Sequence, residues 1–243
     1  MAMNITFLAN PKRFLDFSNA IAPWVCGLAF LLLGTGFYWA LFATPPDYQQ
    51  GQSVKIMFVH VPAAYMGIMI YGLMAGASLV GLVFRHPLAD VAAKSAAPLG
   101  AAFTALALLT GSLWGRPMWG TYWQWGDARL VSELILLFIY LGYIALWNAI
   151  DDPVRAAKAA AILSLVGAAD VPVIHFSVDW WNTLHQPASI IRPGGPTIDK
   201  SFLMPLFIMM LGYTALFAWL WLIRMQTEIF ERRARSLMMA KGA

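Results

Sequence analysis

Six long apolar segments, separated by short polar stretches, dominate the pattern of this chain. Four of them contain no charged residue, one contains only Glu133, and one contains only Asp170. About 20 apolar residues are needed for a helix to cross the hydrocarbon core of a bilayer. The pattern therefore predicts an all-α, polytopic membrane protein with six transmembrane helices. The predicted spans are residues 21–43, 60–84, 95–114, 130–150, 159–178 and 202–223.

The polar stretches differ on the two sides of the predicted membrane. Six spans place both termini on one side, and the two loops on that side are short. The opposite side has three longer outer loops, at residues 44–59, 114–129 and 179–201. The sequence has no internal repeat and no room for a soluble domain, so we expect residues 1–243 to form a single membrane domain.

The distribution of positive charge predicts the orientation. Eleven of the 16 Lys and Arg residues fall on the side of the termini. Because positive charge resists translocation, the richer side is cytoplasmic. We therefore predict cytoplasmic termini and a functional face on the outer side, which is the periplasmic side of the inner membrane if the host is a Gram-negative bacterium. The eleven are Lys12, Arg13, Arg85, Lys94, Arg155, Lys158, Arg224, Arg232, Arg233, Arg235 and Lys241, and the other five are Lys55, Arg116, Arg129, Arg192 and Lys200.

Composition agrees with a membrane environment. The chain is 60% hydrophobic and only 12% charged, whereas soluble domains contain roughly 25% charged residues. The net charge of +4 follows from the basic residues beside the spans, so the predicted partner is the lipid bilayer and no nucleic acid. A single cysteine, Cys26, excludes a disulfide framework and a CxxC haem-attachment motif. The sequence contains no nucleotide-binding, metalloprotease or hydrolase motif, so it offers no independent catalytic motif and leaves open whether the protein assists a reaction on a partner.

The second outer loop is unusually rich in aromatic residues, and the third has two further tryptophans. Interfacial tryptophans are common as membrane anchors, but an anchoring belt occupies both faces of the membrane, whereas the six tryptophans of these two loops lie on one face. A dense, glycine-spaced cluster favours a flat aromatic surface for a large planar ligand such as a porphyrin. The aromatic residues are Trp114, Trp119, Tyr122, Trp123 and Trp125 in the second loop and Trp180 and Trp181 in the third.

Two histidines, His60 and His185, fall on the same outer side as these tryptophans. Two neutral imidazoles can supply both axial ligands of a haem iron, so we predict these residues as the metal ligands. Haem propionates need cationic partners, and arginine pairs with carboxylates in a planar, bidentate geometry. Arg129 is the first candidate because it directly follows the aromatic cluster, and Arg116 and Arg192 are the others.

Four further polar residues leave alternatives open. Asp127 is expected to cap the fourth span and thereby shape the pocket. Glu133 either approaches the outer pocket or pairs with Arg129 at i, i+4 spacing, and the pairing is preferred. Asp170 is a functional candidate because it lies within a span, yet its glycine and proline neighbours favour a kinked, tightly packed helix. His175 is either a third ligand or a structural residue, and the structural role is favoured.

Three motifs resemble the CcmC family, haem-handling membrane proteins of bacterial system I cytochrome c maturation. The similarity extends from Phe14 to about Arg224 and includes the six-span layout. It implies an outer loop that binds haem b as cargo and two outer histidines, here His60 and His185, that ligate the iron. The motifs are Val59-His60-Val-Pro-Ala-Ala64, then Trp119-Gly-Thr-Tyr-Trp-Gln-Trp125 with Asp127-Ala-Arg-Leu, and Trp180-Trp-Asn-Thr-Leu-His185-Gln-Pro187.

The resemblance also implies partners. Members of the family pass haem to a periplasmic haem chaperone, CcmE, on which a covalent bond to haem forms. A small membrane protein, CcmD, assists, and an ABC transporter, CcmA with CcmB, works beside them. One departure is plain: Gly126 separates Trp125 from Asp127, which are adjacent in the family pattern. The motif is preserved if Gly126 is bulged out. Val131 also stands where threonine is more usual.

Two other function classes compete with haem delivery. A permease for a polar solute would use Asp170 on a path between broken helices, but no second broken span of similar character is visible. A cytochrome b-like electron-transfer subunit would need histidine pairs deep in facing spans, and only His175 is near such a place. Haem delivery at the outer face is therefore the main expectation.

Overall fold

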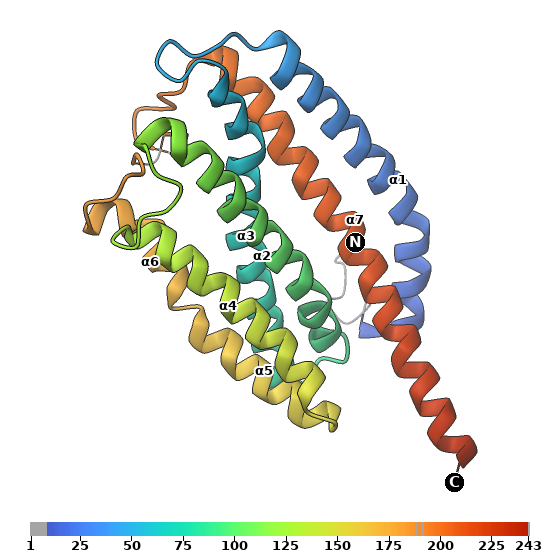
Figure 1. The fold of residues 1–243 in the computed structure, drawn as a ribbon. Coiled ribbons are helices and arrows are strands. Elements are labelled where there is room, and N and C mark those ends of the chain that lie inside the picture. Colours follow the sequence, from blue (N-terminus) through green and yellow to red (C-terminus); the bar gives the residue numbers. More distant parts are fainter. Residues whose placement is uncertain (1–8, 188, 191, 243) are drawn as a thin grey trace.

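The structure, a computed structural model, describes residues 9–187, 189–190 and 192–242. Within these residues the chain is helical and contains no β-strand (Figure 1). Residues 188 and 191 of the predicted third outer loop lie outside the described part. The α-helices are α1 (Pro11–Tyr38), α2 (Met57–Phe84), α3 (Ala89–Trp119), α4 (Ala128–Ala149), α5 (Pro153–Gly167), α6 (Asp170–Trp180) and α7 (Lys200–Gly242); η2 (Trp39–Ala43) is a π-helical turn and η3 (Gln52–Ile56) a 3-10 helix.

Within the described residues, six segments are long and apolar enough to cross a membrane, which confirms the predicted all-α, six-span architecture. The fifth of them consists of α5 and α6 in series, interrupted at Ala168 and Ala169. That interruption is the kink expected just before Asp170. Several helices extend beyond their apolar runs, and α3 continues as far as Trp119. The second outer loop is therefore shorter than predicted and spans only residues 120–127.

Helix α2 lies at the centre of the bundle, where it contacts α3, α5 and α7. Helix α4 packs against α3, α5 and α6, while α1 packs mainly along α7. Figure 1 shows α1 and α7 side by side at one edge of the bundle and α4, α5 and α6 at the other. The largest core residues of α2, among them Met66, Ile70 and Met74, are fully buried.

Two buried tyrosines join the central helices. Tyr71 donates its hydroxyl hydrogen bond to the Ser164 carbonyl oxygen at 2.8 Å, and Tyr140 donates to the Gly67 carbonyl oxygen at 2.8 Å. A buried hydroxyl needs such a partner because lipid offers none. Gly100 allows Tyr140 to approach α3, since a Cβ at that position would overlap the tyrosine ring. Small residues thus permit the close helix contacts that are typical of membrane bundles.

The loops that follow η2, α3 and α6 lie together at one end of the bundle, which we call the loop end (Figure 1). The last turns of α7 extend beyond the opposite end. Near that opposite end Glu228 of α7 pairs with Lys94 of α3 at 2.7 Å and with Arg232 at 2.7 Å. The aromatic and histidine candidates are therefore separated from most of the basic residues by the length of the bundle.

Candidate functional site

His60 is held in one orientation by two helices. It lies in the second turn of α2 rather than at the helix start, because α2 begins at Met57 directly after η3. Its Nδ1 atom is 3.0 Å from the Ala107 carbonyl oxygen and 3.2 Å from Thr110 Oγ1, both on α3. A carbonyl oxygen can only accept, so Nδ1 carries the proton and Nε2 keeps its lone pair. This is the tautomer that a metal-ligating histidine requires.

A glycine on α3 makes this orientation possible. A Cβ at Gly111 would lie 2.9 Å from His60 Cε1 and 3.3 Å from His60 Nδ1. The other side of the imidazole meets Trp114, whose ring centroid is 5.7 Å away at an angle of 71°. Trp114 is itself fixed, since its indole Nε1 donates to Gln50 Oε1 at 3.0 Å. The sequence alone does not predict that Ala107 and Thr110 contact His60 or that Gln50 contacts Trp114, because these contacts join residues distant along the chain.

His185 reaches the loop end from the segment between α6 and α7. Its ring centroid is 5.1 Å from that of Trp119, the last residue of α3. Nδ1 is 3.6 Å from Asp127 Oδ1, which is too long for a hydrogen bond and leaves an electrostatic contact. Burial lowers the pKa of His185, and the positive charge of Arg129 lowers it further, while Asp127 opposes both. The imidazole is therefore neutral at pH 7 and competent to bind a metal ion.

Asp127 connects the Trp-rich loop to the His185 segment. Only 2% of the residue is exposed, and both of its carboxylate oxygens are used. Oδ1 accepts from the backbone N–H of Leu130 at 2.9 Å, which is the predicted cap of α4. Oδ2 accepts from the backbone N–H of Leu184 at 2.7 Å, one residue before His185. The second contact could not be expected from local sequence, and it fixes the histidine segment against α4.

The extra residue in the Trp-rich loop occupies an exposed turn. The Asp127 N–H donates to the Gln124 carbonyl oxygen at 3.1 Å, which places Trp125 and Gly126 at the two corners. A Cβ at Gly126 would meet only the far end of the Gln124 side chain, at 3.6 Å. The insertion therefore projects outward and leaves the capping geometry of Asp127 intact.

Both candidate ligands line one small cavity of about 30 Å³, together with Arg129 and Glu133. Arg129 makes no ion pair within 4.0 Å among the described residues, so its guanidinium is available to an anionic group. The preferred pairing of Glu133 with Arg129 is therefore wrong, and the alternative approach of Glu133 to the pocket is what the structure has. Glu133 is buried, and its Oε1 atom has no hydrogen-bond partner.

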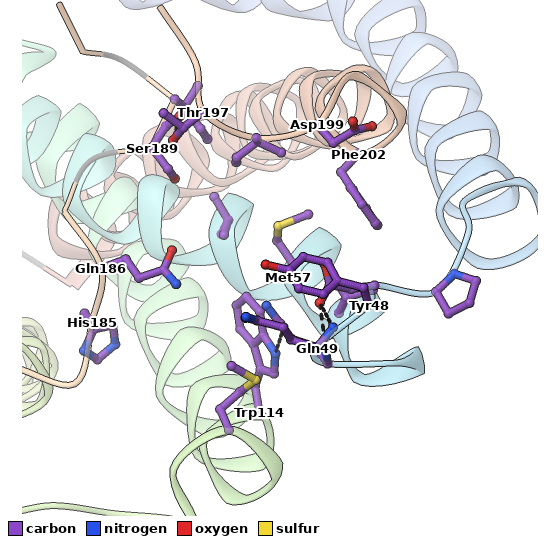
Figure 2. A pocket seen from close by; sticks show the side chains of 18 of the residues that line it. Tyr48, Gln49, Met57, Trp114, His185, Gln186, Ser189, Thr197, Asp199 and Phe202 are labelled. Carbon is purple, nitrogen blue, oxygen red and sulfur yellow. Dashed lines mark hydrogen bonds between the residues drawn. The ribbon is translucent and has the colours of Figure 1, made fainter.

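A larger cavity of about 780 Å³ adjoins this one and shares His185 with it. Trp114 and Trp119 line the larger cavity as well. Ligand pockets typically measure about 300–1,000 Å³, so a large planar molecule can be accommodated here. Figure 2 shows His185 and Trp114 on one side of the cavity, with Asp199 and Phe202 of the α7 start opposite. His185 and the Trp114–His60 contact thus lie between the two cavities.

Other predicted site residues lie at the loop end without lining either cavity. The Trp123 and Trp125 rings are 5.4 Å apart, and Trp125 is 74% exposed. Arg116 donates to the Gly120 carbonyl oxygen and lies 5.7 Å from the ring of Tyr122. Three further predicted residues, Trp180, Trp181 and Arg192, are exposed. These residues form an aromatic and cationic rim rather than the walls of the cavities.

Asp170 and His175 lie outside both cavities. His175 is exposed and contacts Phe176 edge-on, with ring centroids 4.7 Å apart. No group of three or more potential metal-ligating side chains occurs in the part of the chain that the structure describes, so His175 does not join the other histidines. Asp170 has a buried Oδ2 atom that has no hydrogen-bond partner.

Comparison with known proteins gives a consistent family. Residues 4–240 match the family described as Heme exporter protein C. A protein of that name from Bradyrhizobium diazoefficiens is 60% identical over 99% of this chain and 91% of its own length. The Heme exporter protein C of Escherichia coli is 46% identical over 94% and 91%, and that of Haemophilus influenzae 45% identical over 93% and 92%. This chain therefore belongs to the Heme exporter protein C family.

Proposed function

We propose that this protein binds haem at the loop end through His60 and His185 and delivers it to a haem chaperone during cytochrome c maturation. The observation that supports this most is that two imidazoles from distant elements line one cavity. The donor set fits a haem iron, because the Nε2 lone pair of His60 is free and His185 is neutral. The family name, which refers to haem export, points to the same cargo.

The surrounding residues would hold the porphyrin rather than the iron. Trp114 and Trp119 line the large cavity and present apolar ring surfaces to a planar cargo. Arg129 faces the small cavity without an ion pair and would neutralise a propionate, with Arg116 and Arg192 of the rim as further cations. The small cavity is too narrow for a porphyrin, so His185 and its loop must move away from α2 when haem enters.

Delivery requires that one axial imidazole leave the iron. His60 belongs to α2 and its imidazole is fixed by contacts with α3, whereas His185 belongs to a loop and its imidazole contacts Asp127 only electrostatically. His185 is therefore the ligand we expect a chaperone to displace. By analogy with the family, the partners would be a CcmE-like periplasmic chaperone, a CcmD-like small membrane protein and CcmA- and CcmB-like transporter subunits.

Absorption spectroscopy of the purified protein tests this function. We expect a low-spin, bis-imidazole haem spectrum for the wild type and loss of haem or a high-spin spectrum for His60→Ala and His185→Ala. His175→Ala is the matched control, because that histidine is exposed and lies outside both cavities, and its spectrum should not change. A low-spin spectrum that survives the double substitution of His60 and His185 would exclude this site.

A further inference from the structure

We propose that Gln50 of the first outer loop is a positioning residue for the haem cargo and acts through the indole of Trp114. The inference rests on the proposed function, since it requires a porphyrin in the larger cavity. The sequence alone predicts no role for this loop, yet residues 45–50 line the larger cavity together with Trp114. Figure 2 shows Tyr48 and Gln49 of this loop near Trp114. The first outer loop therefore forms a further wall of the candidate site.

The hydrogen bond between Trp114 and Gln50 can have only one direction. An indole Nε1 is a donor only, so the Gln50 atom 3.0 Å from it must be the amide oxygen. This bond restricts the rotation of the indole about its side-chain bonds. It also satisfies the single polar group of the indole within the protein. The ring surface that Trp114 presents to the larger cavity is therefore apolar, as a porphyrin requires.

The backbone of Gln50 is held on both sides of its Cα atom. Its N–H donates to Asp47 Oδ1 at 2.8 Å, and its carbonyl oxygen accepts from the Ser53 N–H at 3.2 Å and from Ser53 Oγ at 2.7 Å. Asp47 and Gly51 also exchange two backbone hydrogen bonds, at 2.9 and 3.1 Å. Gly51 closes this turn with a φ of 57°, which few residues other than glycine adopt. The Gln50 amide therefore reaches Trp114 from a hydrogen-bonded turn.

The position of Trp114 connects this turn to the candidate ligands. Trp114 lines the larger cavity but not the small one, whereas His60 lines only the small one. The two rings meet edge-on, with their centroids 5.7 Å apart. The indole thus lies at the boundary between the space that can hold a porphyrin and the histidine that would bind its iron. A displaced indole would change the cavity wall and would also remove a neighbour of the His60 imidazole.

Titration of the full-length apo protein in detergent with ferric haem, followed at the Soret band, tests this inference. Gln50→Leu has a similar volume but offers no acceptor to the indole N–H, so haem affinity should fall at least about threefold. Gln52→Leu is the matched control, because Gln52 is exposed and lines neither cavity, and its haem affinity should equal that of the wild type. Gln50→Ala tests the same expectation if Gln50→Leu does not accumulate.

A double substitution separates positioning of the indole from a general effect on the loop. Trp114→Phe keeps an aromatic ring but has no N–H, so it should also weaken haem binding. Because Gln50 is proposed to act through the indole, Gln50→Leu should change the haem affinity of Trp114→Phe by less than about twofold. A loss of the same size in both backgrounds would overturn this inference, as would wild-type affinity in Gln50→Leu, and either result would leave the proposed function standing. A wild type that binds no haem would overturn both.

Discussion

Gly111 provides the most specific test of the His60 orientation. The Gly111→Ala variant adds a Cβ that would lie 2.9 Å from His60 Cε1, whereas carbon atoms in contact are normally about 3.5–4.0 Å apart. The imidazole must therefore move by at least about 0.5 Å. Because the new methyl group also approaches Nδ1, at 3.3 Å, the ring has to tilt away from α3. That movement breaks the contact of 3.0 Å with the Ala107 carbonyl oxygen.

The expected magnitude follows from the lost contact. One neutral hydrogen bond contributes about 0.5–1.5 kcal/mol, and loss of the group that orients a metal ligand typically costs about 10–100-fold in affinity. We expect haem affinity to fall at least about tenfold. Alanine is more favourable than glycine within a helix by about 0.8–1.0 kcal/mol, so the bundle itself should remain folded. Gly111→Ala should therefore lower haem affinity while helix propensity favours the folded state, so the two effects can be measured separately.

Titration of the apo protein with ferric haem, followed at the Soret band, measures the affinity, and thermal unfolding measures the stability. Gly76→Ala in α2 is the matched control, because its added Cβ would meet nothing within 4 Å beyond its chain neighbours and the backbone of its own helix. That variant should gain the same helix propensity and bind haem normally. Equal affinities for Gly111→Ala and the wild type would refute the proposed orientation of His60. Equal losses in the two alanine variants would refute it as well.

Three further predictions test other contacts. Asp127→Asn keeps a capping oxygen but turns an N–H group toward the Leu184 N–H. Haem affinity should therefore fall about 10–100-fold, and protease should cut the His185 loop faster. A cleavage rate equal to that of the wild type would refute the role of Asp127 in holding this loop. Burial and the charge of Arg129 hold the pKa of His185 below its ordinary value, so haem affinity should change little between about pH 8 and 7 and should fall at lower pH, where the imidazole protonates. A decline of haem affinity that begins above about pH 7 would contradict the lowered pKa of His185. Gly100→Ala should lower the melting temperature by overpacking against Tyr140, at a cost of about 1–3 kcal/mol or more, whereas an unchanged Tm would contradict that packing.

The membrane architecture could be predicted from sequence because it depends on one strong, local signal. Runs of about 20 apolar residues leave few alternatives to a helix in lipid, and the structure has the six expected segments. The kink before Asp170 was equally accessible, since Gly167 and Pro172 are visible in the sequence. Topology alone placed His60 and His185 at one end, and the structure brings them to a common cavity.

The remaining details depend on long-range packing, which a local pattern does not contain. The sequence predicted that Glu133 pairs with Arg129, because i, i+4 spacing allows it, but Glu133 Oε1 instead lies against Gly67 of α2, 3.4 Å from where a Cβ would be. The second oxygen of Asp127 is used by a residue 57 positions away. Helix α3 passes Trp114 and ends at Trp119, where Gly120 takes a left-handed conformation, φ 77°, that stops it.

The two cavities together suggest why one histidine is on a helix and the other on a loop. Under the proposed function, a porphyrin in the larger cavity would meet Trp114, Trp119 and His185 before it could reach His60. Formation of the second iron bond would then require movement of the His185 loop, which the Leu184–Asp127 hydrogen bond restrains. A charge-assisted bond of this kind contributes about 1.5–3 kcal/mol, enough to limit the rate but not to prevent exchange. Under the proposed function, a fixed His60 would retain the iron while His185 is replaced, so that the cargo would not be released into water during transfer.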